Sequence, residues 1–179
     1  MALFKLSKKP SSIDGNGLFT DEDIAKGEII MIWLDGAYLI NETKYIESQK
    51  KGDKNMVITG ARAVHNIYLH TSDEPRYENF MNHSDSPNVL YHAGICYALE
   101  NIPANTELTT DYRFILSDKD VPFLDKTNGK EVIGFGNMQS LLLSAKKLVE
   151  ILETTDLCNN ADRTINCSLI KDDYSARKN

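Results

Sequence analysis

The sequence predicts a mainly β fold with short helices and a C-terminal amphipathic helix. Over residues 1–112, short apolar segments alternate with turns about every eight to twelve residues, which is typical of a β-rich fold. Beyond Asn137, apolar residues recur at helical spacing. The chain has 179 residues and 41% hydrophobic content, which suits one domain with a substantial core.

The strands follow in order along the first 112 residues. An apolar segment at 2–6 predicts the first strand, and the β-branched run 28–34 predicts a buried one. Further short strands are expected at 56–59, 66–70, 88–92, 95–100 and 107–109. Turns rich in glycine, proline or asparagine separate them, at 14–17, 25–27, 35–36, 93–94 and 102–105. Residues 71–79 are expected to form a polar loop.

Two helices are predicted. Asn41 is a suitable N-cap, Glu42 suits the first turn and Gly52 follows the end, so a helix is expected over 42–50. Asn137 is a candidate cap for a second helix over 137–153. Its apolar face consists of Met138, Leu141, Leu142, Ala145, Leu148, Val149 and Leu152. This face is expected to lie on the β core or on a partner.

Charge and composition narrow the classes of partner. The net charge of −6 disfavours nucleic acid, which selects basic surfaces, and suits either a basic peptide substrate or solubility alone. No apolar run reaches the roughly 18 residues of a membrane helix, so no membrane partner is expected. Three widely spaced cysteines and an N-terminus without a signal peptide predict an intracellular protein.

Three short segments carry candidate chemistry, and each has an ordinary interpretation when taken alone. The glycines in Gly15-Asn16-Gly17-Leu18-Phe19 allow close approach of a ligand, but they equally suit a plain hairpin turn. In Asn82-His83, the histidine is a catalytic base, a metal ligand or a buried hydrogen-bonding group. The tyrosine that ends Glu107–Tyr112 is, by itself, most simply a core or rim residue.

In their order and spacing, these segments resemble the SET-domain family of protein lysine methyltransferases. The matching runs are Gly15 to Phe19 followed by Lys26-Gly27-Glu28, then Phe80-x-Asn82-His83-Ser84-x-x-Pro87-Asn88, then Glu107 to Tyr112. The chain departs from the family pattern at Asn79, where arginine is usual, and at Asp85, where cysteine is usual. It also lacks the cysteine-rich zinc segments of many members, so it resembles a compact one.

The resemblance implies a fold and a division of the chain. The expected fold is the SET-domain, β-clip-like arrangement of small sheets with a knot-like C-terminal threading. Residues 1–116 would form the SET core, and residues 117–153 would form an extension whose helix closes the site. Residues 154–179 would be a polar tail.

The resemblance also implies S-adenosylmethionine as the cofactor and assigns site residues. The cofactor-binding residues would be Gly15, Asn16, Gly17, Leu18, Asn82, His83 and Tyr112. Tyr112 would also be the catalytic residue, with its hydroxyl beside the reacting centre. Thr110, Tyr68 and Trp33 would line the substrate channel, and no metal is expected. Phe114, Phe123 and Phe135 are alternative aromatic lids over the adenine, or core residues.

The implied reaction is methylation of a lysine amine in a protein substrate, such as a histone or another basic protein. Only the neutral amine is nucleophilic, and its deprotonation at pH 7 costs about 4–5 kcal/mol. A positioned phenol therefore fits a site that works mainly by orientation. In this family the residue two before the tyrosine influences the number of methyl groups added, and the small Thr110 predicts di- or trimethylation. The alternative is a catalytically inactive SET-fold interaction module. A homodimer is compatible with either.

Overall fold

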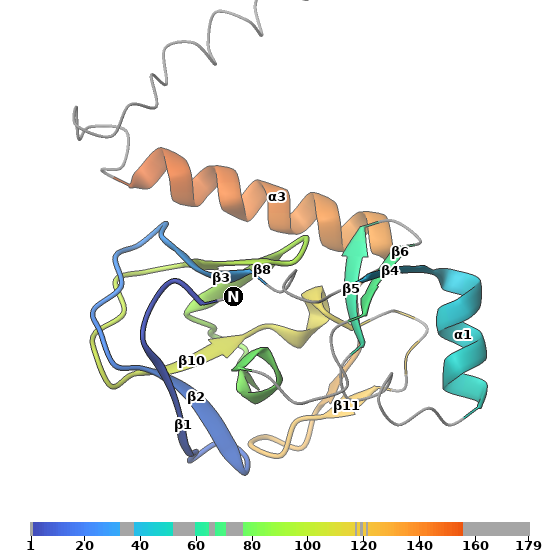
Figure 1. Cartoon of the computed structure of the whole chain (residues 1–179), viewed down its shortest axis with the longest axis horizontal. Helices are drawn as coiled ribbons and strands as arrows, with labels where there is room; N and C mark the ends of the chain where they lie inside the picture. Colours follow the sequence, from blue (N-terminus) through green and yellow to red (C-terminus); the bar gives the residue numbers. More distant parts are fainter. Residues whose placement is uncertain are drawn as a thin grey trace, which may run out of the picture.

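The computed structural model describes residues 2–32, 38–51, 60–64, 67–70, 77–116, 118, 120 and 122–155 (Figure 1). The first strands are β1 (Leu6–Pro10), β2 (Asn16–Thr20), β3 (Ile29–Ile32), β4 (Tyr38–Asn41), β5 (Gly60–Val64) and β6 (Ile67–His70). The later strands are β7 (Asn82–His83), β8 (Val89–His92), β9 (Ile95–Ala98), β10 (Glu107–Thr110), β11 (Phe123–Leu124) and β12 (Glu131–Val132). The helices are α1 (Glu42–Lys50), α3 (Asn137–Thr154) and the 3-10 turns η1 (Tyr77–Phe80) and η2 (Tyr112–Phe114). The predicted mainly β fold with a C-terminal helix is confirmed.

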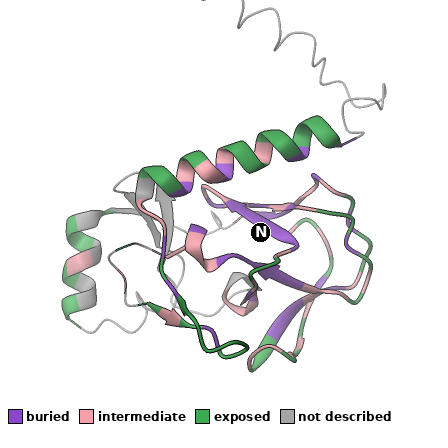
Figure 2. Cartoon of the chain, turned by 180° about the vertical axis from the view of Figure 1, so that it is seen from behind, coloured by how far each residue is buried: buried purple, intermediate pink, exposed green. Residues whose placement is uncertain are grey.

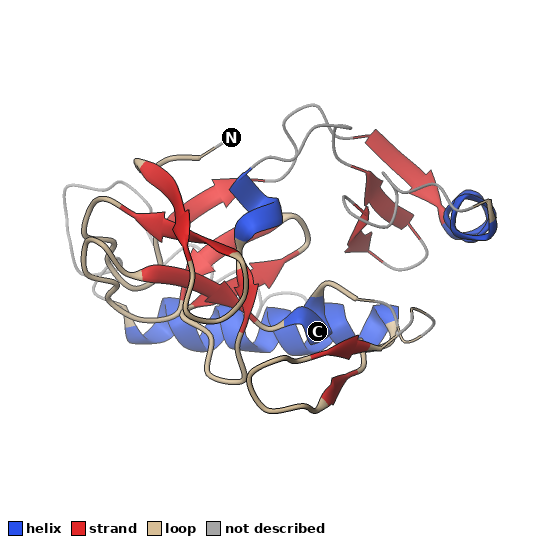
Figure 3. Cartoon of the chain, turned by 90° about the horizontal axis from the view of Figure 1, so that it is seen from below, coloured by secondary structure: helices blue, strands red, loops and turns tan. Residues whose placement is uncertain are grey.

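The largest sheet brings distant segments of the chain together around β10. Its strand order is β1-β2-β10-β8-β9-β3, and β7 also pairs with β10. β10 is antiparallel to β2 and parallel to β7 and β8. The order β4-β6-β5 forms a second sheet, which lies with α1 at one end of the molecule (Figure 3). The knot-like threading remains a prediction.

The core lies within the largest sheet. Leu18 of β2, Ile30 of β3 and Leu108 of β10 have no exposed surface, and the strands that carry them are largely buried (Figure 2). Each such side chain contributes about 1.5–3 kcal/mol by leaving water. No helix within the described ranges is long and apolar enough to cross a membrane.

Several local predictions are confirmed. Ala93 and Gly94 both have positive φ, 48° and 89°, as a two-residue hairpin turn between β8 and β9 requires. The predicted turn at 102–105 is present, and within it Asn105 adopts the left-handed region with φ of 66°. Asn41 caps α1, because its Oδ1 accepts a hydrogen bond of 2.9 Å from the backbone N–H of Lys44.

The strand boundaries needed correction. β1 covers 6–10 rather than the predicted 2–6, where Ala2 forms only an isolated bridge to Met31. β1 is an edge strand, and an edge position accommodates Lys9 and Pro10, which the apolar pattern did not favour. β3 and β6 fall within the predicted 28–34 and 66–70. The predicted strand at 56–59 and the turn at 35–36 lie outside the described residues.

Several elements were not predicted from the sequence. They are the strands β2, β4, β5, β7, β11 and β12 and the turns η1 and η2. β11 and β12 contain two residues each, which is too short for a periodic pattern to be recognised. Their pairing depends on the turn and on contacts with the rest of the fold.

The C-terminal helix is confirmed over Asn137–Thr154, but its cap and buried face differ from the prediction. The N-cap is Gly136, so Asn137 is the first helical residue. The most buried side chains are Ser140, Ser144 and Ile151, whereas four members of the predicted apolar face are exposed. Ser140 Oγ donates to the carbonyl of Phe114, and Ser144 Oγ lies 2.8 Å from His92 Nδ1. The face of α3 that carries Ser140 and Ser144 is therefore the one packed on the protein, where both serines have hydrogen-bond partners.

Candidate active site

The glycine turn joins β1 to β2, and its two glycines are required for different reasons. Gly15 has a φ of 51°, and a Cβ there would meet no atom within 4 Å, so the backbone conformation selects glycine. Gly17 does not have positive φ. A Cβ on Gly17 would collide with the Glu107 carboxylate, so the close approach of that side chain selects glycine here.

Asn82 connects this turn to β10. Asn82 and His83 form β7, which lies beside Thr109 and Thr110 of β10. Asn82 Nδ2 donates to Glu107 Oε1 at 2.8 Å and lies 3.2 Å from the carbonyl oxygen of Asp14. Because these neighbours are acceptors, the network itself fixes which end of the amide carries the nitrogen.

Glu107 is the residue on which these segments converge. Its carboxylate accepts hydrogen bonds from Ser11 Oγ, at 2.8 Å, and from Asn82 Nδ2. The side chain of Asn88 binds the backbone of β10. Its Nδ2 donates to the Glu107 carbonyl and its Oδ1 accepts from the backbone N–H of Thr109, each at 2.8 Å. The glycine turn, the Asn82-His83 pair and β10 are therefore one hydrogen-bonded unit.

His83 is buried, and only one of its ring nitrogens has a hydrogen-bond partner among the described residues. Nδ1 accepts from the backbone N–H of Tyr112 at 3.2 Å, so in the neutral ring the proton resides on Nε2. Nε2 has no hydrogen-bond partner there, and the nearest carboxylate oxygen, Asp85 Oδ1, is 3.7 Å away. A buried donor without a partner is unfavourable, and such a donor is often completed by a ligand.

Tyr112 begins η2 directly after β10. Its hydroxyl donates to the carbonyl of Met81 at 3.0 Å, which leaves the phenolic oxygen lone pairs to accept other contacts. Burial, with a smaller contribution from the charge of Asp14, raises the pKa of Tyr112 to about 12. The side chain is therefore a neutral phenol at physiological pH.

The β11–β12 hairpin completes the cluster through Phe123. The Phe123 ring lies 5.0 Å from the Tyr112 ring and 6.0 Å from the His83 ring, in edge-to-face arrangements. Phe114 and Phe135 instead pair with each other, 5.2 Å apart. Of the three aromatic lid candidates, Phe123 is thus the one that the fold places against the motif residues.

The turn of this hairpin also reaches the glycine turn. Lys126 Nζ forms an ion pair with Asp14 Oδ1 at 2.8 Å. Asp125 organises the turn: its carboxylate accepts from the Thr127 hydroxyl and backbone N–H, and these hydrogen bonds lower its pKa. Gly129 supplies a φ of 71°. Nothing in the sequence pattern pointed to Lys126 as a site residue.

The remaining predicted site residues are less well placed or not described. Thr110 is fully buried in β10, and its hydroxyl has no hydrogen-bond partner among the described residues. Leu18 lies in β2 between β1 and β10, with its side chain in the core. Tyr68 belongs to β6, but its side chain is not described, and Trp33 lies outside the described residues. No group of three or more metal-ligating side chains occurs in the described part of the chain.

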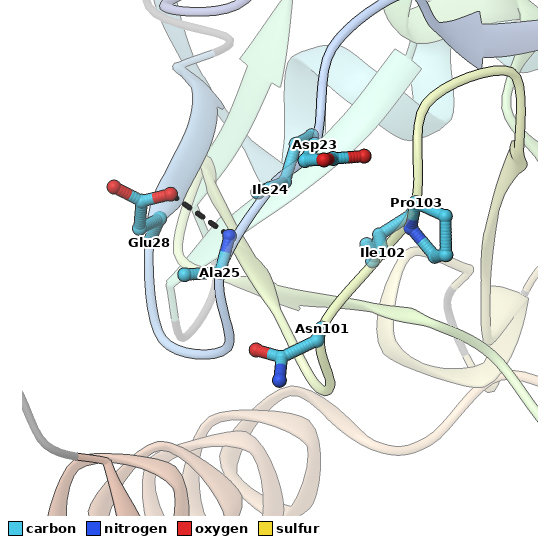
Figure 4. A pocket seen from close by; sticks show the side chains of 7 residues that line it. All are labelled: Asp23, Ile24, Ala25, Glu28, Asn101, Ile102 and Pro103. Carbon is cyan, nitrogen blue, oxygen red and sulfur yellow. Dashed lines mark hydrogen bonds between the residues drawn. The ribbon is translucent and has the colours of Figure 1, made fainter.

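An open pocket of about 460 Å³ lies elsewhere on the molecule (Figure 4). It is lined by Asp23, Ile24, Ala25, Glu28, Asn101, Ile102 and Pro103. These residues follow the C-terminal end of β2 and precede β10, whereas the glycine turn and Tyr112 lie at the opposite ends of these two strands. The pocket and the motif cluster are therefore separate features.

Comparison with known proteins identifies the class. The SET-domain family matches residues 15–113, more than half of the chain, and the chain belongs to this family. Family membership supports a methyltransferase. The solved structure of a candidate histone methyltransferase from Plasmodium falciparum is 27% identical, covers 61% of this chain and 93% of its own, and has a TM-score of 0.44. No match was found among curated proteins.

Proposed function

We propose that this chain is an S-adenosylmethionine-dependent protein lysine N-methyltransferase. The observation that carries the proposal is that Asn82-His83 is joined by hydrogen bonds to the glycine turn, to Glu107 and to Tyr112. These are the three segments whose order and spacing mark the family. Here hydrogen bonds join them across β2, β7 and β10.

The residues present fit the cofactor. The His83 Nε2–H is a buried donor that a polar ligand would satisfy. The Gly15–Gly17 turn offers backbone that a ligand can approach closely, and nothing lies within 4 Å of a Cβ position on Gly15. Phe123 supplies an aromatic face beside His83 and Tyr112. Gly15–Leu18, Asn82, His83 and Tyr112 would hold the cofactor, which supplies an electrophilic methyl group on a sulfonium.

Tyr112 acts in this proposal by orientation rather than as a base. With a pKa of about 12, about one phenol in 10⁵ is ionised at pH 7. Its proton is engaged by the Met81 carbonyl, so the oxygen presents lone pairs to the reacting groups. Those lone pairs can hold an amine hydrogen or a polarised methyl C–H. Positioning of this kind is a large source of rate for a displacement between two bound groups.

The proposed substrate is a lysine in a basic protein segment, such as a histone tail. The net charge of −6 favours encounter with such a segment over nucleic acid. The substrate channel would include Thr110, Tyr68 and Trp33. The division into a core over 1–116, a closing extension over 117–153 and a tail over 154–179 is part of the same proposal.

Two measurements test the proposal and separate it from an inactive SET-fold interaction module. S-adenosylhomocysteine should raise the melting temperature of the protein, because a ligand that binds only the folded state stabilises it. Labelled cofactor incubated with histones, other basic proteins and cell lysate should then label a lysine. Stabilisation without transfer would favour the inactive module, and absence of both would contradict the proposal.

A further inference from the structure

The half-buried carboxylate of Glu107 makes no ion pair within the described part of the chain. Its partners are two neutral donors, Ser11 Oγ at 2.8 and 2.9 Å and Asn82 Nδ2 at 2.8 Å. Hydrogen bonds from neutral groups offset the cost of partly burying a charge, but they do not cancel the charge itself. The negative potential that remains favours a cationic group in a ligand bound nearby.

The carboxylate of Glu107 also determines which way its neighbours point, because it accepts hydrogen bonds and cannot donate them. The Ser11 hydroxyl directs its proton to Glu107, and its oxygen accepts from the backbone N–H of Ile13 at 2.9 Å. The Asn82 amide likewise turns its nitrogen toward Glu107. An order that begins on β10 therefore extends into the chain that leads to the glycine turn.

Asn82 is held in one orientation of its side-chain amide. Besides Glu107, its Nδ2 has the Ser11 hydroxyl oxygen at 3.1 Å and the Asp14 carbonyl oxygen at 3.2 Å. Its other end, Oδ1, makes no hydrogen bond within the described residues. Asn82 therefore offers a bound ligand an acceptor rather than a donor.

The ligand group that matches this acceptor is an ammonium. S-adenosylmethionine carries one at its amino-acid end, whereas its other hydrogen-bond donors, the adenine amine and the ribose hydroxyls, are uncharged. A hydrogen bond from a charged donor is roughly twice as strong as one between neutral groups. The free Oδ1 of Asn82, next to a carboxylate without a cation, selects the charged donor.

We propose that Glu107 is a positioning residue for the cofactor. It fixes the Asn82 amide so that Oδ1 receives the ammonium group of the amino-acid end, and its own negative charge favours that cation. Glu107 acts through Asn82 and was not among the predicted cofactor-binding residues. This inference rests on the proposed use of S-adenosylmethionine and deepens it.

Calorimetry with two ligands separates positioning from a merely structural role. S-adenosylhomocysteine carries the ammonium group, and its deaminated analogue has hydrogen in that place. The wild-type protein should bind S-adenosylhomocysteine about tenfold or more tightly than the analogue. Glu107→Met, which removes the carboxylate from a side chain of similar length, should reduce this preference about fivefold or more. Glu107→Ala carries the same expectation, so the test does not depend on one variant folding.

Glu107→Gln is the matched control. Its Oε1 can still accept from Asn82 while its Nε2 donates to Ser11 Oγ, so the preference should stay within about threefold of the wild-type value. Glu100→Ala removes an exposed carboxylate outside the network and should leave both Kd values unchanged.

The outcomes distinguish this inference from the proposed function. If Glu107→Met and Glu107→Ala weaken both ligands equally, Glu107 only holds the turn in place and the positioning role is overturned. Equal wild-type affinities for the two ligands would also overturn it, while leaving the proposed function intact. Absence of binding of either ligand to the wild-type protein would contradict both.

Discussion

Asn82 and Glu107 are joined by a hydrogen bond of 2.8 Å, from the amide nitrogen of one to the carboxylate Oε1 of the other. This contact links two family motifs that are 25 residues apart in sequence. The same carboxylate lies where a Cβ on Gly17 would be, so it also determines one residue of the third motif. The three motifs are thus coupled by packing and hydrogen bonding in the protein alone.

Gly17→Ala is expected to lower the free energy of unfolding by about 1–3 kcal/mol. The new methyl group displaces the Glu107 carboxylate and leaves its half-buried donors, Ser11 Oγ and Asn82 Nδ2, without that partner. Urea denaturation measures the change. In a Glu107→Ala background the same substitution should be nearly neutral, since the obstructing carboxylate is absent.

Gly15→Ala is the matched control. It should destabilise by about 1 kcal/mol in both backgrounds, because its effect comes from left-handed backbone and not from Glu107. Equal effects of Gly17→Ala with and without Glu107 would show that the close approach is not what selects glycine at that position.

Tyr112→Phe is expected to keep the fold and cofactor affinity and to reduce the methylation rate by one to several powers of ten, about 10–10³. The ring and its contacts with His83 and Phe123 remain, and only the hydroxyl that orients reacting groups is lost. Loss of the hydrogen bond to Met81 should lower stability by about 0.5–1.5 kcal/mol. Single-turnover kinetics and calorimetry with S-adenosylhomocysteine measure the two effects.

The pH dependence of the methylation rate, compared between the wild-type protein and Tyr112→Phe, distinguishes an orienting role of Tyr112 from base catalysis. Burial raises the pKa of Tyr112 to about 12, so the phenol stays neutral between about pH 7 and about pH 10. Both enzymes should speed up together as the substrate lysine deprotonates, with a constant ratio of rates. A ratio that grows with pH would mean that ionised Tyr112 takes the proton.

Phe123→Ala is expected to weaken S-adenosylhomocysteine binding by about 1–3 kcal/mol, or roughly 5- to 150-fold in Kd. The substitution removes the aromatic face beside Tyr112 and His83. Leu124→Ala is the control, because the neighbouring Leu124 is 57% exposed and should leave the Kd unchanged. Similar affinities in both variants would place the lid elsewhere.

Ile151→Ala is expected to destabilise the protein by about 2–5 kcal/mol, since Ile151 is 4% exposed on the buried face of α3. Leu152→Ala, at 41% exposed, should cost under about 1 kcal/mol. Denaturant titrations measure both. Ending the chain at residue 136 removes the whole helix and should be more damaging than either substitution. A larger effect of Leu152→Ala than of Ile151→Ala would indicate that the apolar face predicted from the sequence is the buried one.

The sequence was most informative where local chemistry decides structure. The Asn41 cap, the Ala93-Gly94 turn and Asn105 each depend on the preferences of one or two residues. The helix α3 was also predicted correctly, but its buried face was not, because leucines occur on several sides of the helix. Ser140 and Ser144 lie on the buried face and contact Phe114 and His92, and the spacing of apolar residues does not reveal such polar contacts.

In the candidate site, too, some residues could be predicted from the sequence and others could not. Asn82, His83 and Tyr112 were recognisable by motif, whereas the central role of Glu107 required the side-chain network. Phe123 could not be distinguished from two other phenylalanines, since a two-residue strand brings it to the site. Long-range contacts of this kind leave no pattern in a single sequence.

Thr110 leads to a prediction about the number of methyl groups transferred. It lies two residues before Tyr112, beside His83 in the register of β10 and β7, and its buried hydroxyl has no partner among the described residues. A side chain this small leaves space for a methylated amine to rotate and present its lone pair again. Its position also lacks a bulky phenol that could hold water in that space. We therefore expect di- or trimethylated lysine as the final product.

Mass spectrometry of the product over a long time course measures the outcome. Thr110→Val, which keeps the shape but removes the hydroxyl, should leave the distribution of methylation states unchanged if volume is what matters. It should also be tolerated by the fold, because it removes a buried polar group without a partner. A wild-type reaction that stops at one methyl group with excess cofactor would show that Thr110 does not set the limit. A shift confined to Thr110→Val would assign the control to the hydroxyl.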